Sequence, residues 1–362
     1  MTEAREHFTI KEIHEDAEAA SRTIGAFDEI AKTAEEVSKA KYDLYVVTGA
    51  GTSLHAGIAA SYAFYELLGL PFIPFHAVEL VHTASNVLKG RRSLLIAISQ
   101  SGESSDTLRA VRKAKEYGAE VLGVTNFPES SLARESRYKL ITRAGEEKAV
   151  LATKTYVAQL TVLYGFCVAL AQRMGADVGG LLNEIKNAGD LVQGALKSEE
   201  EVKRLAKYVR PFADAYVLGS DVTYPTALEA ALKLKEGCLI HSEAFPAPEF
   251  RHGPISLVDS SSLILALYPP RERKEAHQAL HKVIVETHEA GATVIAIAED
   301  GDDAPKECSD FILRVPTITP LFASLVYVVP CQLLTYYVAI AKGLNPDQPR
   351  RLTKVVKLGR GP

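Results

Sequence analysis

The feature that most constrains the fold of this chain is an internal repeat. The string YVVTGA at Tyr45 is echoed by YVLGSD at Tyr216, and SLLIAIS at Ser93 is echoed by SLILALY at Ser262. A third pair, YGAEVLGVTN and AGATVIAIAE, has the same spacing of about 170 residues. The sequence therefore predicts a tandem duplication, in which each copy is long enough to form a domain with its own core.

Both copies alternate short apolar runs with helical patterns. Such alternation predicts a parallel sheet covered by helices on both faces, so the fold class is α/β with two doubly wound sheets. The predicted domains are a helical lead (residues 1–40), a first sheet domain (41–175), a helical connector (176–205), a second sheet domain (206–344) and a tail (345–362). The predicted strands are Leu44–Thr48, Phe72–Phe75, Ser93–Ile98, Glu120–Thr125, Tyr138–Thr142, Ala215–Leu218, Ser262–Leu267, Thr293–Ala298 and Phe311–Val315.

Composition excludes several classes of function. The net charge is -4 and charged residues are spread along the chain, so nothing favours a nucleic acid partner. The first residues, MTEAREHFTIKEIHED, are too charged for a secretory signal. The cysteines lie far apart in mostly apolar sequence, which predicts free thiols and a cytoplasmic protein. They are Cys167, Cys238, Cys308 and Cys331.

Two stretches without charged residues, Thr155–Gln172 and Leu321–Ala341, approach the length of a membrane span. Both contain Gln, Thr and Tyr, and the second contains Pro330. We therefore expect helices that are buried under a sheet or in a subunit interface, and no membrane association.

The stretch SQSGESSDT, residues 99–107, follows a predicted buried strand and precedes a predicted helix. Helix N-termini attract anions because their first N–H groups lack partners, and the hydroxyls here can donate as well. An ordinary helix cap is the alternative, but a cap needs one hydroxyl and this stretch has four Ser and one Thr. The second copy has YPPRER at residues 268–273, so the sequence predicts one phosphate site per chain.

The turn GAGTS, residues 49–53, follows the first predicted strand. Ligands of open parallel sheets bind beyond the carboxyl ends of the strands, so this turn and the residue 99–107 stretch are expected to line one crevice. A dinucleotide-binding turn would have glycine where Leu54 stands, so no nucleotide cofactor is predicted.

The ionisable residues gather in the second copy. Glu229, Lys233 and Glu236 share one face of a predicted helix, and periodicity alone favours a solvated, salt-bridged stripe there. His252, in a charged loop before Gly-Pro, is a candidate for proton transfer. A helical row of His277, His281 and His288 lacks the intervening carboxylate of a metalloprotease, so no metal site is predicted.

Several motifs together resemble the sugar isomerase (SIS) domain pair of the glucosamine-6-phosphate synthases, also called glutamine–fructose-6-phosphate aminotransferases. They occur in the family's order over residues 11–356. These motifs are GTSLHAG, SQSGESSDT, ESSLARES, TRAG, ALEAALKLKE, HSEAFPAPEFRHGP and DQPRRLTKVV.

The resemblance implies roles for individual residues. Glu236 is expected to move the proton between C1 and C2 of a sugar phosphate, with Lys233 one turn before it, and His252 to open the ring. Lys354 is expected to form a Schiff base with the open-chain ketose. Residues implied to bind the phosphate are Ser53, Ser99, Gln100, Ser101 and Ser104, and Val150 is implied to lie near the sugar.

The chain departs from the family pattern at several positions. Ser104 replaces a usual Thr and keeps the hydroxyl. Ala152 replaces a Ser that contacts the sugar and Leu151 replaces a small neighbour, so the sugar pocket is expected to differ. The synthases begin with a glutaminase domain that has a Cys nucleophile, whereas here Thr2 opens a short helical lead.

The sequence therefore predicts a glucosamine-6-phosphate deaminase of the SIS type. Two alternatives stay open: amination with free ammonia or a separate glutaminase subunit, and a catalytically silent sugar-phosphate sensor. Retention of Glu236, His252 and Lys354 argues against the sensor, since binding alone needs none of them. In the family the neighbouring subunit supplies the histidine, which implies a homodimer.

Overall fold

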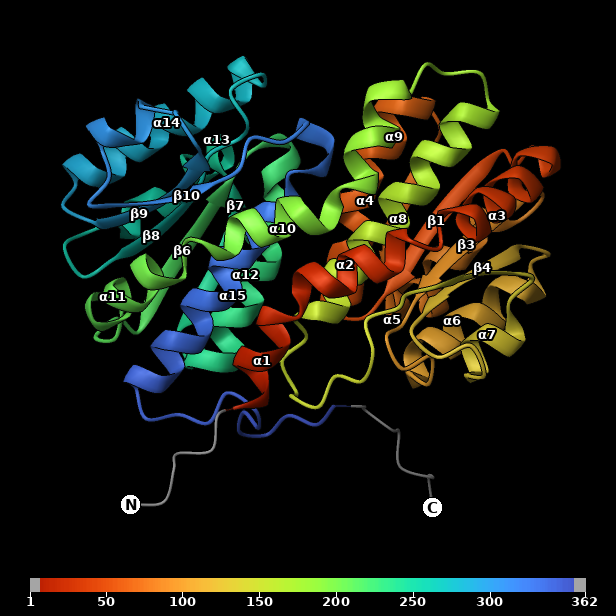
Figure 1. Ribbon diagram of the computed structural model, residues 1–362, viewed down its shortest axis with the longest axis horizontal. Coiled ribbons are helices and arrows are strands. Elements are labelled where there is room, and N and C mark those ends of the chain that lie inside the picture. The colour runs from red at the N-terminus through yellow and green to blue at the C-terminus, as the bar shows by residue number, and fades with distance from the viewer. Residues whose placement is uncertain (1–6, 355–362) are drawn as a thin grey trace. The chain divides into compact units, whose positions relative to one another are not determined.

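In the computed structural model, which describes residues 7–354, the chain forms two compact units that interleave along the sequence. One, the first-sheet unit, contains residues 16–147, 154–189 and, at the end of the described chain, 353–354. The other, the second-sheet unit, contains the described residues up to 15, the short segment 148–153 and residues 190–352. Figure 1 shows the elements of both units.

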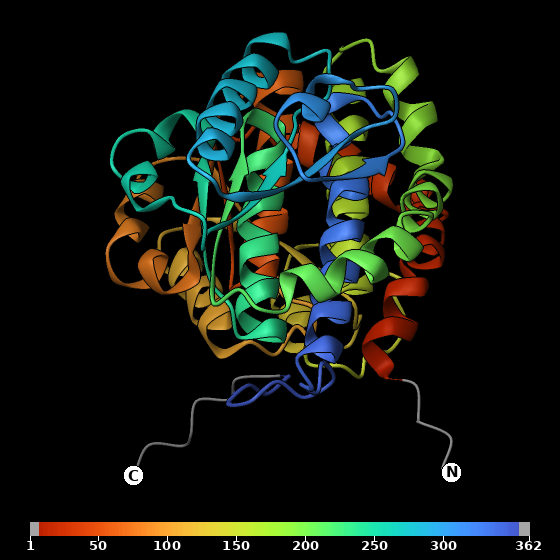
Figure 2. The same ribbon diagram turned by 90° about the vertical axis from the view of Figure 1, so that its left-hand side faces the viewer.

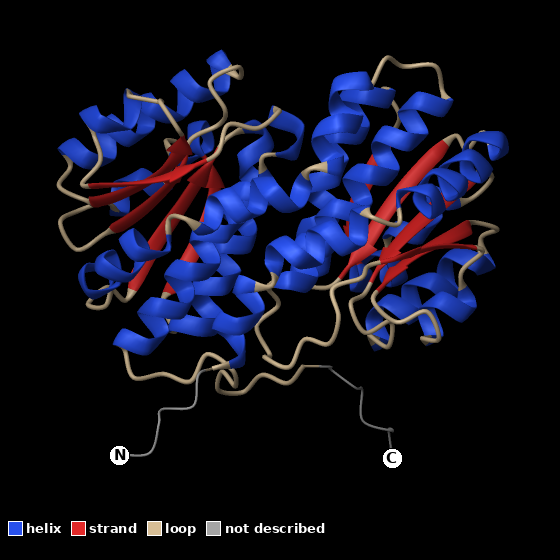
Figure 3. Cartoon of the chain, in the orientation of Figure 1, coloured by secondary structure: helices blue, strands red, loops and turns tan. Residues whose placement is uncertain are grey.

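Each unit is built on a parallel five-stranded sheet. The strand orders are β2-β1-β3-β4-β5 and, read from its other edge, β7-β6-β8-β9-β10, so the two copies have the same topology. The predicted fold class is confirmed. Figure 3 shows each sheet with helices on both faces.

The elements of the first-sheet unit begin with two helices and then alternate between strands and helices. They are α2 (Asp16–Ile24), α3 (Phe27–Ala40), β1 (Leu44–Gly49), α4 (Thr52–Leu68), β2 (Phe72–His76), α5 (Ala77–His82), the 3-10 helix η1 (Ala84–Leu88), β3 (Ser93–Ile98), α6 (Ser105–Glu116), β4 (Glu120–Thr125), α7 (Ser131–Glu135), β5 (Tyr138–Ile141), α8 (Lys154–Arg173) and α9 (Gly179–Lys186).

The second-sheet unit adds a helix from the start of the chain to a second alternating series, which α10 (Ala188–Leu196) leads into. The elements are α1 (Phe8–His14), α11 (Glu199–Val209), β6 (Asp214–Gly219), η2 (Asp221–Thr223), α12 (Tyr224–Cys238), β7 (His241–Pro246), α13 (Ala247–Phe250), η3 (Pro254–Leu257), β8 (Leu263–Leu267), α14 (Lys274–Glu289), β9 (Thr293–Glu299), η4 (Ala304–Glu307), β10 (Phe311–Val315), η5 (Pro320–Phe322) and α15 (Ser324–Ala341).

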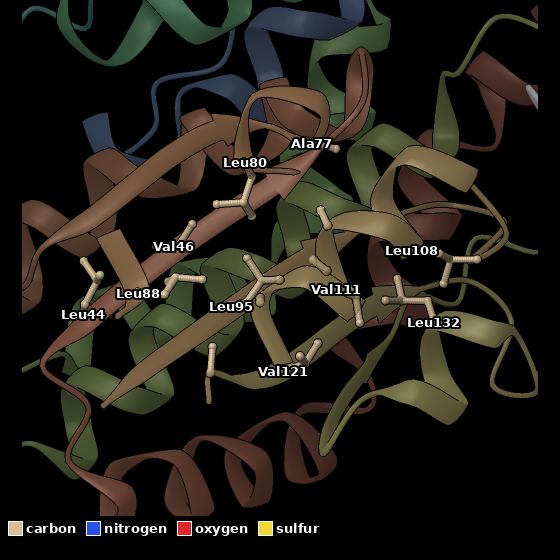
Figure 4. Packing of buried hydrophobic residues seen from close by; sticks show 14 residues of the cluster. Leu44, Val46, Ala77, Leu80, Leu88, Leu95, Leu108, Val111, Val121 and Leu132 are labelled. Carbon is tan, nitrogen blue, oxygen red and sulfur yellow. The ribbon is translucent and has the colours of Figure 1, made fainter. Parts of the chain in front are cut away.

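The central strands are buried along their whole length and mostly apolar, because helices cover both faces of the sheet. Every residue of β1 and β3 is buried. One core of the first-sheet unit joins Val46, Leu95 and Val121 of the sheet to Leu80 of α5 and Val111 of α6 (Figure 4). The side chains of α6 explain this packing, since its apolar residues recur at helical spacing and form one buried face.

The two uncharged stretches form core helices, as the sequence predicts. The helices α8 and α15 are long and apolar enough to cross a membrane, but 94% of each apolar window is buried. In the first-sheet unit α8 packs against α2, α3 and α4, and in the second-sheet unit α15 packs against α1, α11 and α12. Figures 1 and 2 show α12 and α15 running alongside each other.

Candidate functional site

The turn between β3 and α6 holds the hydroxyl-rich stretch at the carboxyl edge of the first sheet. Ser99 is buried, and its Oγ accepts a hydrogen bond from the Gly102 backbone N–H at 3.1 Å. The Oγ of Ser101 accepts from the Glu103 N–H at 3.1 Å. These bonds fold residues 99–103 into a tight loop that delivers the chain to the N-terminus of α6.

Gly102 cannot be replaced without moving this turn. Its φ is +66°, and an added Cβ would lie 2.1 Å from the Ser130 Oγ and 2.9 Å from the Thr125 Oγ1. The Gly102 carbonyl also accepts from the Leu132 N–H. The turn is therefore packed against the segment after β4 and is held in one conformation.

The start of α6 does not use its hydroxyls as an ordinary cap would. Ser104 is the N-cap residue, and within the described residues no side-chain hydrogen bond caps this helix. Thr107 Oγ1 lies 3.2 Å from Ser104 Oγ and donates to it. The partial positive charge of a 12-residue helix thus meets several hydroxyls, a combination suited to a phosphate.

The turn after β1 adjoins the turn after β3. The strands β1 and β3 pair directly, and the strand order reverses direction between them. An added Cβ at Gly49 would lie 3.0 Å from the Leu54 N and 3.1 Å from the carbonyl oxygen of Ile98. Ser53, in the first turn of α4, accepts at Oγ from the Gln159 side chain at 3.2 Å. The structure therefore brings Ser53 and the residue 99–104 turn to the same edge of the first sheet, at neighbouring strands.

The helix α12 carries a buried ionic row. Lys233 Nζ lies 2.5 Å from Glu236 Oε2 and 3.3 Å from Glu229 Oε1. The side chains of Glu229 and Lys233 are 1% and 2% exposed, so the solvated stripe favoured by periodicity is wrong for these two residues. Helix α15 packs along α12, as do β6 and β7, and residue spacing could not reveal that this packing buries Glu229 and Lys233.

Lys233 keeps its charge in this environment. Burial lowers the pKa of Lys233, but the carboxylates of Glu229 and Glu236 outweigh that effect and hold the pKa above its usual value. Lys233 is thus a fixed cation that orients Glu236 and is unsuited to take up a proton.

Glu236 is the member of this row that faces a pocket. Its side chain is 23% exposed and lies on the wall of a pocket of about 200 Å³. The other wall is the segment that follows α15. The lining residues are Glu236, Gly237, Leu239, Gly343, Leu344, Asn345, Gln348, Pro349 and Arg350.

Hydrogen bonds of Asp347 hold the tail against α1 and against the segment that contains Val150. The carboxylate of Asp347 accepts from the Phe8 N–H, the Thr9 N–H and the Thr9 hydroxyl at the start of α1, at 3.0, 2.8 and 2.8 Å. Its backbone carbonyl accepts from the Val150 N–H at 2.9 Å. Two predicted site segments, the Val150 segment and the tail, therefore meet at α1.

Lys354 lies in the first-sheet unit and contacts a residue that the sequence analysis did not single out. Its Nζ lies 2.6 Å from the Oε2 of Glu147, whose side chain is completely buried. No periodicity marks Glu147, which stands in an irregular segment between charged and small residues.

His252 does not lie near Glu236 within the second-sheet unit. Helix α12 runs back from the carboxyl edge of the sheet, so Glu236 lies at the amino edge, where β7 begins at His241. The six residues of β7 then span roughly 17 Å to the carboxyl edge, where α13 and His252 follow. Figure 1 shows α13 and the start of the tail at opposite ends of this sheet.

Comparisons with known proteins agree with the two-sheet fold. The protein-family model described as "SIS domain" matches residues 37–169 and 213–342, which together contain both sheets. The chain belongs to the SIS domain family. Each matched segment contains one copy of the repeat, so the duplication is a pair of SIS domains.

The most similar relatives of this SIS protein include synthases and one deaminase. Glutamine–fructose-6-phosphate aminotransferase from Methanothermobacter thermautotrophicus is 39% identical over 97% of this chain and 57% of its own length. The C-terminal domain of the Francisella tularensis enzyme is 33% identical with a TM-score of 0.87, covering 95% of this chain and 99% of that domain. Glucosamine-6-phosphate deaminase from Thermotoga maritima is 25% identical with a TM-score of 0.78, covering 97% and 100%. The chain thus spans little more than half of the curated aminotransferases that it matches.

The histidine row of the second SIS domain has a structural explanation. Each histidine of α14 faces a different carboxylate of the segment after β9: His277 pairs with Asp302 at 2.7 Å, and His281 pairs with Glu307 at 3.1 Å. His288 lies 3.8 Å from Asp310. Within residues 7–354 no group of three or more ligand residues is arranged around one metal position.

Proposed function

We propose that this SIS protein converts glucosamine 6-phosphate and water to fructose 6-phosphate and ammonia. The observation that carries the proposal is Glu236, a pocket-lining carboxylate whose orientation is fixed by the buried cation Lys233. Moving a proton from C2 to C1 of an open-chain amino sugar needs one positioned base of this kind.

The turn hydroxyls support a phosphorylated substrate. Ser99, Gln100, Ser101 and Ser104 directly precede the N-terminus of α6, and Ser53 lies in the first turn of α4. A phosphate at such helix N-termini finds N–H and O–H donors. Binding energy from a phosphate distant from the reacting carbons can be used to hold those carbons against the base.

The proposed reaction has four steps. His252 opens the sugar ring, and Glu236 removes the C2 proton and returns it at C1, which converts the amine into a C2 ketimine. The Lys354 amine displaces ammonia to form its own ketimine, and water then releases fructose 6-phosphate and the free lysine. Val150 lies in the segment proposed to border the sugar.

A homodimer is part of the proposal. Because β7 separates His252 from Glu236 within one unit, a histidine that serves the Glu236 pocket has to come from another subunit. Leu257 ends η3 and is close to His252 in sequence. Its side chain is apolar and the residue is 66% exposed, so it suits burial against a partner subunit.

The deaminase direction is supported by the Thermotoga maritima structure, since this chain has a counterpart for 100% of it. The higher identity of 39% to an aminotransferase supports a second candidate, amination of fructose 6-phosphate with ammonia from a separate glutaminase. Both candidates use the same isomerising residues. A cytoplasmic location is proposed with either, since sugar phosphates are intracellular metabolites and all four cysteines are free and buried.

The experiment is an assay of purified protein with glucosamine 6-phosphate, in which ammonia and fructose 6-phosphate are both measured. We expect both products in equal amounts, and a rate lower by about 10²- to 10⁴-fold in Glu236→Gln. Glu243→Gln, at an exposed position of β7, is the matched control.

Each contrary outcome selects another reading. Absence of ammonia from the parent protein, with product formed from fructose 6-phosphate and ammonium, would replace deamination by amination. Binding without turnover in either direction would leave a sensor. Full activity in Glu236→Gln would remove Glu236 from the mechanism.

A further inference from the structure

The contact between Glu147 and Lys354 carries a further inference, which rests on the proposed role of Lys354. These residues are 207 positions apart in sequence and lie in the same compact unit. The distance from Lys354 Nζ to Glu147 Oε2 is 2.6 Å, a charge-assisted hydrogen bond. Lys354, in the tail, therefore contacts the buried carboxylate of Glu147 directly.

The Glu147 carboxylate is fixed by the first turn of α8. Its Oε1 accepts from the Thr155 N–H at 3.2 Å, and its Oε2 accepts from the Thr155 hydroxyl at 2.7 Å. With these two bonds made, the orientation of the carboxylate directs Oε2 at the lysine. The charged groups next to it in the chain are the exposed Glu146 and Lys148, and Lys154, which is buried at the start of α8.

The Lys354 side chain differs from its partner in exposure. Glu147 is completely buried, whereas the Lys354 side chain is 26% exposed. One side of the ammonium group therefore faces a carboxylate, and part of the side chain is open to solvent and to a ligand.

A lysine that attacks a carbonyl must first lose its extra proton. We propose that Glu147 is the base that accepts this proton. The proton moves from Lys354 Nζ to Glu147 Oε2, and the neutral amine then bonds to the C2 carbon of the open-chain ketose. Burial favours the transfer, because the ion pair loses solvation that the neutral amine and carboxylic acid hardly need.

The rest of the step balances without a further reactant. Attack converts the carbonyl oxygen to a hydroxyl after it takes up the proton held by Glu147. Loss of that hydroxyl as water, with a proton from the nitrogen or from solvent, leaves the ketimine. Glu147 ends as a carboxylate and is ready for the reverse sequence when water releases the sugar.

The test is borohydride trapping with fructose 6-phosphate, in which reduction of the ketimine links the sugar to Lys354. The full chain is compared with Glu147→Gln, Glu147→Asp and the exposed control Glu146→Gln, and the adduct is located by peptide mass. Calorimetric titration with fructose 6-phosphate shows that each variant still binds.

We expect Glu147→Gln to trap at least a hundredfold more slowly than the parent at pH 7. Its rate should rise with pH, because without the base only the fraction of Lys354 that is already deprotonated reacts, whereas the parent rate should be flatter. Glu147→Asp should recover part of the rate, and Glu146→Gln should match the parent.

Other results overturn the inference in distinguishable ways. Equal rates and equal pH profiles in the parent and Glu147→Gln would show that Glu147 is no base. Ammonia release without any adduct on Lys354 would refute the inference and the Lys354 step of the proposed reaction, while the overall conversion of glucosamine 6-phosphate would stand. Absence of both activities in the parent would refute the proposed function itself.

Discussion

The turn after β3 and the turn after β8 occupy the same place in two sheets of the same strand order, but they contain opposite kinds of side chain. Residues 99–104 present hydroxyls around a helix N-terminus. Residues 268–273 present a completely buried tyrosine, two prolines and two arginines. The fold accepts both turns, so the hydroxyls are not needed to form it.

The second turn satisfies its charges within the protein. Arg273 forms an ion pair with Asp221, from the turn after β6, at 3.4 Å. The Arg271 guanidinium pairs with Glu299, with Nε 3.6 Å from Oε2, and the same Oε2 accepts from the Arg271 backbone N–H at 3.0 Å. The corresponding two turns of the first sheet, residues 49–53 and 99–104, consist largely of glycine and serine and contain no arginine.

The helices that follow the first strand of each sheet, α4 and α12, also differ, but here it is the second copy that carries the candidate functional residues. Helix α4 contains no lysine, whereas α12 contains the buried row of Glu229, Lys233 and Glu236. One copy therefore carries the candidate anion turn and the other carries the candidate proton-transfer group, so neither copy alone has the full set.

The largest expected effect is the loss of stability in Lys233→Met, which removes the buried lysine that α12 has and α4 lacks. Two carboxylates would then share a buried position without a cation, so we expect the free energy of unfolding to fall by about 3–5 kcal/mol. Urea unfolding of the purified variant measures this loss.

Lys235→Met, at an exposed position of the same helix, is the control for Lys233→Met. The double variant Glu229→Gln with Lys233→Met should recover part of the loss, since it removes one of the uncompensated charges. An equal loss in the control and in Lys233→Met would contradict the importance of the buried row.

A middle-sized effect is expected when the first turn loses its hydroxyls. Ser101→Ala and Ser104→Ala should each raise KM for the sugar phosphate about tenfold to a hundredfold, because each removes a donor to a charged group. Steady-state kinetics should show little change in kcat.

The matched change in the second turn is Arg273→Gln, which removes the ion pair with Asp221. It should leave KM unchanged and cost less than about 1 kcal/mol of stability, because both side chains are partly exposed. A KM that rises more in Arg273→Gln than in the serine variants would reverse the assignment of the two turns.

The smallest effect concerns acid stability, where the segments after β4 and β9 differ. Burial raises the pKa of Asp302, but His277, the Ala304 N–H and Arg314 outweigh it and leave the pKa below its usual value. The stability that results is present above pH 4, the range of an unfolded Asp, and is lost as pH falls through the lower folded value.

Thermal unfolding of Asp302→Asn against pH measures this contribution. The parent should be more stable than the variant near pH 6, and the two should converge below pH 3. Asn126, the first residue after β4 in the first sheet, is uncharged, so Asn126→Ala should shift stability equally at all pH values. A gap between parent and Asp302→Asn that widens in acid would contradict the assignment.

All nine predicted strands are present, because buried parallel strands have unbroken apolar runs. The strand β7 was not predicted, since its sequence HSEAFP is polar and lies at the edge of the sheet. The repeat contained the missing signal: adding about 170 residues to Phe72–His76 leads to residues 242–246.

The candidate site was less accessible from the sequence. Spacing placed Glu229, Lys233 and Glu236 on one face, but whether α15 covers that face depends on tertiary packing. The anion turn was predictable, because strand, hydroxyls and helix are contiguous. Glu147 and Asp347 were missed because their partners lie hundreds of residues away in the chain, beyond any local pattern.

These long separations in sequence also determine when, during synthesis of the chain, the proposed active site can form. The hydrogen bond between Thr9 and Asp347 joins residues 338 positions apart, and the contact between Glu147 and Lys354 joins residues 207 positions apart. Neither can form until its later residue has been synthesised. Translation delivers the chain from its N-terminus, so both sheets can assemble on the ribosome before either contact exists. A nascent chain with complete sheets would therefore lack the lysine proposed to bind sugar covalently, and that chemistry would begin only once Lys354 has left the ribosome.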